Sequence, residues 1–123
     1  MNLQKFGFTT LVDGVEKNGK IFSDVQQALA LGGITYGVKN IELNASYATI
    51  ANGGQYIRPK LYTIVKDHDG NVILDNTSTE GTQVIKPSTA FLLTSAMQDV
   101  VTSGTGTAVN FGGMSIAGKT GTT

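Results

Sequence analysis

Two stretches of the chain carry apolar residues at helical spacing, and residues 40–52 are the first. Asn40 is a suitable N-cap for this stretch, and Asn52-Gly53-Gly54 is typical of a left-handed helix stop. Its apolar members recur at intervals of three and four, namely Leu43, Tyr47, Ile50 and Ala51, with Ala48 near the edge. The pattern therefore predicts an amphipathic helix that buries this face.

The second helical stretch covers residues 88–102, with Pro87 and Ser88 marking its entry. Its predicted buried stripe consists of Ala90, Leu93, Met97, Val100 and Val101. Residues 103–107, Ser-Gly-Thr-Gly-Thr, indicate a loop, and residues 107–111 one further helical turn that Gly112-Gly113 ends.

Residues 60–75 predict a β-hairpin. Two runs rich in β-branched residues, 61–65 and 72–74, flank an Asp69-Gly70 pair, which is a strong signal for a hairpin turn. The stretch 76–86 reads as a polar loop that ends in Val84-Ile85. Within residues 1–37 the pattern is weaker: we expect a helix tail ending near Gly7, a turn at 17–20 and a short helix over 24–31.

The last stretch, residues 115–123, is rich in threonine and predicts a strand. The order helix, hairpin, helix, strand indicates an α/β (α+β) fold with helices packed on an antiparallel sheet. A terminal strand that carries a site normally has neighbours on both sides, and only one hairpin is available. We therefore expect that further strands of the fold lie in sequence outside this chain.

Composition narrows the possible functions. The 123 residues suffice for one small domain, and nine basic residues balance nine acidic ones, which argues against nucleic acid as a partner. There is no cysteine, and the single His68 lies in the predicted turn, so no metal site and no cofactor is expected. No apolar run approaches the length of a transmembrane helix.

The chemistry gathers in the final residues, Gly118-Lys119-Thr120-Gly121-Thr122-Thr123. A lysine, a hydroxyl residue and a glycine on a predicted strand resemble the Lys-Thr-Gly box of serine enzymes that react with penicillin. The triplet alone also fits a solvated lysine on an edge strand. Residues 113–120 further match the P-loop pattern Gly-x-x-x-x-Gly-Lys-Thr, although the apolar strand before it and the helix after it are absent from the pattern.

Flanking sequence favours the first interpretation. Leu29–Gly33, Glu42–Gly54, Ser103–Ala108 and Ala117–Thr123 together resemble the class A, bifunctional penicillin-binding proteins, in the order and separation of their transpeptidase domain. The resemblance implies a partial transpeptidase domain over residues 1–123, from a membrane-anchored enzyme with a glycosyltransferase domain that works outside the cytoplasmic membrane. Its partners would be D-Ala-D-Ala stem peptides, β-lactams and the rest of the domain.

The family's nucleophile and its lysine come from a Ser-x-x-Lys box, and a second serine and an asparagine from a Ser-x-Asn box. Neither box occurs in the 123 residues, so the resemblance predicts that this chain alone is inactive. What carries over is the third box. Lys119 and Thr122 would be catalytic, Lys119 as a fixed positive charge and Thr122 through a backbone N–H of the oxyanion hole. Thr120, Gly121 and Thr122 would bind the substrate's terminal carboxylate.

Strand alternation puts Thr120 and Thr122 on the face opposite Lys119. All can serve one substrate only at an open strand edge, so we expect a free edge at residues 118–123, where substrate binds as an added strand. A non-catalytic module with a degenerate transpeptidase fold stays open as an alternative, as does a nucleotide-binding P-loop protein.

Overall fold

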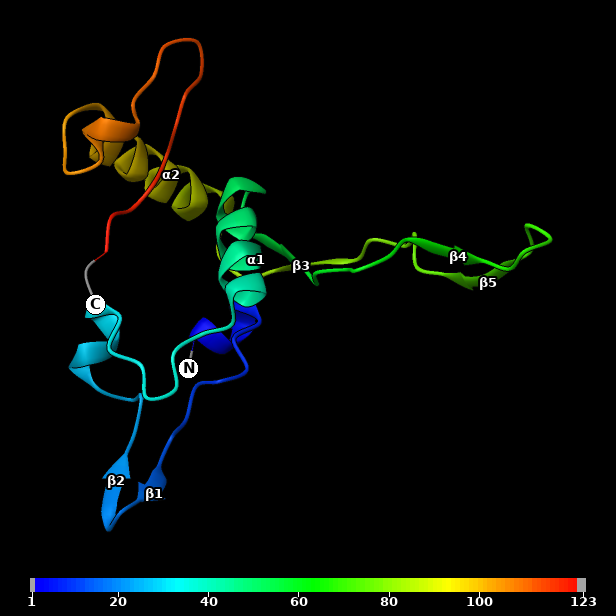
Figure 1. Cartoon of the computed structure of the whole chain (residues 1–123). Helices are drawn as coiled ribbons and strands as arrows, with labels where there is room; N and C mark the ends of the chain where they lie inside the picture. Colours follow the sequence, from blue (N-terminus) through cyan, green and yellow to red (C-terminus); the bar gives the residue numbers. More distant parts are fainter. Residues whose placement is uncertain (1, 122–123) are drawn as a thin grey trace.

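The computed structural model describes residues 2–121 and has a mixed α/β fold (Figure 1). Helices α1 (Asn40–Ala51) and α2 (Pro87–Thr102) contact each other. The described residues also form three short 3-10 helices: η1 (Asn2–Phe6), which contacts α1, η2 (Gln27–Leu31), and η3 (Thr107–Val109), which contacts α2. Six strands form three separate two-stranded antiparallel sheets within the described residues. The predicted fold class is confirmed, with the sheet in three pieces.

Both long helices occur where the hydrophobic pattern predicts them, and their ends follow local chemistry. Pro87 occupies the first turn of α2, as expected of a residue without a backbone N–H. Gly53 and Gly54 have φ values of 62° and 86° and end α1 in the left-handed region. The predicted N-cap of α1 was wrong by one residue, because Lys39 holds the extended cap position and Asn40 is already helical.

The predicted buried face of α1 was also wrong. Four small or polar residues are buried, namely Glu42, Ala45, Ser46 and Thr49, whereas Leu43 and Tyr47 are each 40% exposed. Small side chains let α1 approach η1, β3 and α2 closely. The buried polar groups are satisfied: Thr49 donates to the Ala45 carbonyl at 2.8 Å, and Glu42 accepts from Thr9. Hydrogen bonding therefore outweighs the hydropathy pattern on this helix.

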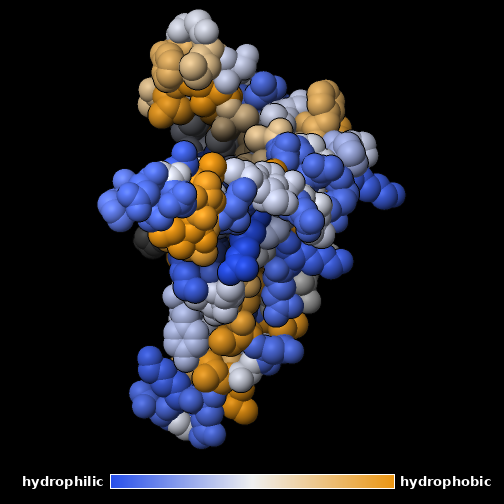
Figure 2. Space-filling model, turned by 90° about the vertical axis from the view of Figure 1, so that its right-hand side faces the viewer, coloured by the Kyte–Doolittle hydropathy of each residue, from blue (hydrophilic) through white to orange (hydrophobic). Residues whose placement is uncertain are grey.

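Helix α2 keeps part of its predicted stripe. Ala90 and Val101 are buried, and Met97 and Val100 are half-buried. Leu93 is 42% exposed, so its predicted burial was wrong. Apolar surface is left on the helix pair by the exposed side chains of Phe91, Leu92 and Leu93 on α2 and of Leu43 and Tyr47 on α1. Figure 2, seen from the side that lies on the right in Figure 1, shows hydrophobic patches beside hydrophilic ones.

The predicted hairpin is confirmed as β4 (Ile64–Lys66) and β5 (Val72–Asp75). It forms the outer part of an arm that projects from α1 (Figure 1). At the base of the arm, β3 (Gln55–Ile57) pairs with β6 (Gly81–Gln83), in a stretch where the sequence predicted a polar loop. The β3–β6 pairing joins residues 24 to 28 positions apart, so local patterning gave no sign of it.

Residues 15–22 form a second hairpin that the pattern predicted only as a turn. Strand β1 (Val15–Lys17) pairs with β2 (Lys20–Phe22), and Asn18 and Gly19 both have positive φ, at 54° and 71°. This is the geometry of a two-residue turn that matches strand twist. The predicted helix over 24–31 is shorter, being the 3-10 turn η2. The helix tail before Gly7 and the turn over 107–111 are confirmed as η1 and η3.

The predicted final strand is not formed over residues 115–121, and Thr122 and Thr123 lie outside the described residues. A strand needs a ladder of hydrogen bonds to a neighbour. The three described sheets use other segments, and none pairs with residues 115–121. The alternation of Lys119 and Thr120 across a sheet and the predicted free edge therefore stay predictions.

Candidate functional site

The segment that carries the Lys-Thr-Gly box runs along α2. The Gly118 N–H donates to the Met97 carbonyl at 3.1 Å, so a carbonyl within α2 fixes the start of the box. A Cβ on Gly118 would lie 3.7 Å from Val101, which is fully buried. The box therefore begins against the packed side of α2.

A second contact holds the box from the loop after α2. The hydroxyl oxygens of Thr105 and Thr120 lie 2.7 Å apart and share a hydrogen bond. The loop itself is tied to α2, because the Gly106 N–H donates to the Val100 carbonyl at 2.9 Å. At Gly104, a Cβ would lie only 2.9 Å from the Val100 Cα, so a residue without a side chain allows this close approach.

Lys119 is exposed, and its ammonium group donates to the Thr120 carbonyl at 2.7 Å. No carboxylate neutralises it among the described residues. The Lys119 ammonium group can therefore bind an anion if it gives up its hydrogen bond to the Thr120 carbonyl. Thr122, the other predicted catalytic residue, lies outside the described residues, while the structure brings Thr120 and Gly121 together with Lys119.

The box faces a hollow of about 480 Å³. One wall is Lys119, Thr120 and Gly121, and the other is Ala30, Leu31 and Gly32 at the end of η2. Leu31 is 91% exposed, so the opposite wall presents an apolar side chain to the hollow. A cation and a hydroxyl on one side with an apolar group on the other suit a ligand that has an anionic end and an apolar body.

Sequence reasoning missed Thr105 and Leu31 as members of this site. Gly104 and Gly106 were expected to shape a loop near the cleft, and Ser103–Ala108 was one of the segments that carry the family resemblance, but no contact of Thr105 with the box was predicted. Nothing in the spacing of residues 30 and 120 indicated that they face one hollow.

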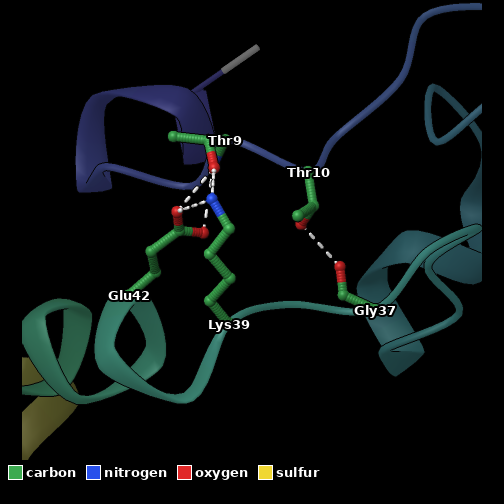
Figure 3. Close-up of polar contacts among 5 residues, drawn as sticks. All are labelled: Thr9, Thr10, Gly37, Lys39 and Glu42. Atoms are coloured by element: carbon green, nitrogen blue, oxygen red, sulfur yellow. Dashed lines mark hydrogen bonds and ion pairs between the residues drawn. The ribbon is translucent and has the colours of Figure 1, made fainter.

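Two buried carboxylate groups, those of Glu42 and Asp24, accept hydrogen bonds that link separate segments in the N-terminal half of the chain. Figure 3 shows Lys39 and Glu42, at the start of α1, converging on Thr9. The Thr9 hydroxyl donates to Glu42 Oε1 at 2.6 Å, and Lys39 Nζ donates to that hydroxyl oxygen at 2.7 Å. The Thr9 hydrogen bond lowers the pKa of Glu42 against the opposing effect of burial. Beside this cluster, the Thr10 hydroxyl donates to the Gly37 carbonyl at 2.6 Å (Figure 3).

The second carboxylate, Asp24, is fully buried and accepts three hydrogen bonds. The N–H groups of Val12 and Thr35 each donate at 2.8 Å, and the Thr35 hydroxyl donates at 2.7 Å. The Val12 N–H is the largest cause that lowers the pKa of Asp24. Val12 precedes the β1–β2 hairpin, Asp24 lies between this hairpin and η2, and Thr35 follows η2. The hydrogen bonds of Asp24 therefore hold these three segments together.

The described residues do not favour the other chemistries. A P-loop requires a helix that starts at its lysine, and residues 119–121 are not helical. Residues 2–121 contain no cluster of three potential metal-ligating side chains. Among the helices that the structure describes, none has the length and apolar character to cross a membrane.

Comparison with known proteins decides the family. The model of the penicillin-binding protein transpeptidase domain matches residues 2–123, almost the whole chain. The chain belongs to the penicillin-binding protein transpeptidase family. The family membership predicted from the four sequence segments is thereby confirmed. The three small sheets and the two long helices are part of a penicillin-binding transpeptidase fold.

Named relatives agree with this assignment. Penicillin-binding protein 1A of Clostridium novyi is 37% identical over 95% of this chain, and penicillin-binding protein 1F of Bacillus subtilis is 36% identical over 98%. Penicillin-binding protein 4 of Bacillus subtilis is 33% identical over 98%. The chain spans 14%, 17% and 18% of the lengths of these three relatives, respectively.

Proposed function

We propose that this chain forms the Lys-Thr-Gly side of the active site of a D,D-transpeptidase that cross-links peptidoglycan stem peptides through a serine acyl-enzyme. One observation carries the proposal: the family's Lys-Thr-Gly box is fixed at Gly118 and Thr120 while the Lys119 charge stays exposed beside a hollow. A fixed cation near a cleft favours a bound anion, such as the carboxylate of D-Ala-D-Ala or of a β-lactam.

In this proposal each box residue has one task. Lys119 attracts the terminal carboxylate and favours proton transfer at the serine pair. The hydroxyls of Thr120 and Thr122 donate hydrogen bonds to that carboxylate, and Gly121 leaves room for the substrate backbone. The Thr122 N–H donates to the oxyanion of the tetrahedral intermediate, a contact worth about 3–4 kcal/mol in other acyl-transfer sites.

The nucleophile has no counterpart in the 123 residues, because no serine is followed by lysine three positions later. The site therefore needs a serine and its lysine from outside the printed sequence. We place the working enzyme on the outer face of the bacterial membrane, where its peptide substrates are, and include a glycosyltransferase domain in it.

A mass-spectrometric comparison tests the proposal. The chain alone, incubated with a labelled penicillin, is expected to keep its mass. A chimera of Clostridium novyi penicillin-binding protein 1A, in which this chain replaces the matched segment, is expected to gain one penicilloyl group. A folded chimera that stays unlabelled would favour the alternative of a non-catalytic module, and acylation of the chain alone would refute the assignment of the nucleophile.

A further inference from the structure

A second hollow, of about 360 Å³, lies on the β1–β2 hairpin, away from the Lys-Thr-Gly box. It is lined by Lys17, Asn18, Lys20, Phe22, Thr35 and Tyr36. We propose that this hollow binds a sugar phosphate, with the phosphate between the ammonium groups of Lys17 and Lys20 and the sugar ring against Phe22 and Tyr36. The proposal is independent of the transpeptidase function.

The strand register places the two lysines together. Lys17 and Lys20 are direct cross-strand partners, so their side chains share one face of the hairpin. Two like charges directly opposite one another destabilise a strand pair. No carboxylate pairs with either lysine among the described residues. A bound dianion would remove the repulsion and replace it with two charge-assisted hydrogen bonds.

The two faces of the β1–β2 hairpin differ in charge. Alternation along β2 puts Phe22 on the same face as Lys20. Glu16 pairs with Ile21, so the only acidic residue of the two strands belongs to the opposite face. The face that carries the lysines is therefore cationic and aromatic. In Figure 2 the hairpin forms the lower end of the molecule, where hydrophilic surface adjoins hydrophobic surface.

Two aromatic rings and two hydrogen-bonding groups complete the lining of the hollow. Phe22 and Tyr36 are 40% and 55% exposed, so both rings have surface for a ligand. The Asn18 amide and the Tyr36 hydroxyl line the hollow without a partner in the part of the chain that the structure describes. Such groups donate to and accept from sugar hydroxyls, which distinguishes a sugar phosphate from phosphate alone.

The walls are held together before any ligand binds. Asp24 accepts hydrogen bonds from Val12, at the foot of the hairpin, and from Thr35, next to Tyr36. The Asp24 N–H also donates to the Val12 carbonyl at 2.8 Å. A rigid connection between the lysine wall and the Tyr36 wall lowers the entropy that a ligand must offset on binding.

Titration of the isotopically labelled 123-residue chain with glucose 6-phosphate, followed by amide NMR shifts, tests the proposal. We expect saturable shifts at Asn18, Lys20 and Tyr36, with Kd of about 1 mM or tighter. The double variant Lys17→Gln, Lys20→Gln should weaken binding about tenfold or more, because two charge-assisted contacts are lost. The double arginine variant should retain binding, and Lys66→Gln, on the distant β4–β5 hairpin, should bind as the unaltered chain does.

Three results would overturn the proposal. The first is the absence of saturable shifts at residues 17–36 in a chain with a dispersed amide spectrum. The second is equal binding by the double glutamine variant, which would remove the phosphate contact. The third is an affinity pattern that does not depend on the sugar: equal affinity for inorganic phosphate would show that the sugar makes no contact, and higher affinity for uridine monophosphate would assign the two rings to a nucleobase.

Discussion

Gly53 and Gly54 provide a matched test of how the arm is joined to α1. Both glycines have positive φ, at 62° and 86°, so alanine at either position carries the cost of the left-handed region. That cost is about 1–2 kcal/mol. The surroundings differ: a Cβ on Gly53 would meet nothing within 4 Å, whereas one on Gly54 would collide with the Ile85 carbonyl oxygen.

The collision at Gly54 has no easy relief. The same Cβ would lie 2.9 Å from both the Gln83 Nε2 and the Ile85 Cγ1 atoms. The Gly54 carbonyl accepts the Val84 N–H at 2.8 Å, so moving the strand away breaks the contact that continues the β3–β6 pairing. We add about 1–3 kcal/mol for overpacking to the cost of the left-handed region. The expected total is then about 2–5 kcal/mol for Gly54→Ala, against about 1–2 kcal/mol for Gly53→Ala.

Urea unfolding followed by circular dichroism measures the difference. With a slope of about 2 kcal/mol per molar urea, Gly53→Ala should lower the midpoint by about 0.5–1 M and Gly54→Ala by about 1–2.5 M. Gly19→Ala, in the β1–β2 turn with nothing within 4 Å of its Cβ, is a second control that should resemble Gly53→Ala. Equal shifts for Gly53→Ala and Gly54→Ala would refute the packing at the base of the arm.

Three further predictions concern the framework of the site. Because its pKa is lowered in the folded chain, Asp24 stabilises the chain fully above about pH 5, and this contribution is lost as pH falls below about 4. Asp24→Asn should flatten that acid limb in thermal melts recorded from pH 3 to 7, and an unchanged limb would contradict the role of Asp24. Val101→Ala should cost about 1–2 kcal/mol in urea unfolding, since Val101 is fully buried under Gly118, and a loss near zero would contradict this packing. Thr105→Val should raise amide hydrogen exchange of Thr120 a few-fold by removing one hydrogen bond, whereas Thr105→Ser should not; equal exchange in both variants would exclude the contact.

Local patterning predicted the elements whose signals lie within a few residues. The periodicity of residues 40–52 and 88–102, the Pro87 entry and the Asp69-Gly70 turn all correspond to elements of the structure. Local patterning could not predict contacts between segments that are far apart in the sequence. The β3–β6 pairing joins segments on both sides of a hairpin, and the buried face of α1 depends on Thr9, which lies 33 positions before Glu42.

The site divides in the same way. Lys119, Thr120 and Gly121 were predicted as site residues from their motif, because the box consists of consecutive residues, and this assignment stays a prediction. Thr105 and Leu31 were not, because only the folded chain brings them to the box. The predicted strand over 115–121 failed for a related reason: threonine content favours extended backbone, but pairing requires a neighbouring strand that no described segment provides.

Penicillin acylation of the chimera with Clostridium novyi penicillin-binding protein 1A, with and without a change at Lys119, tests the central claim most directly. The account predicts that the chimera reacts and that Lys119→Ala slows acylation about 100-fold or more, because the fixed charge beside the serine pair is lost. Lys66→Ala, on the projecting hairpin, should react at the rate of the unaltered chimera. Equal acylation rates for the Lys119 and Lys66 variants, or a folded chimera that never reacts, would contradict the proposed role of this chain.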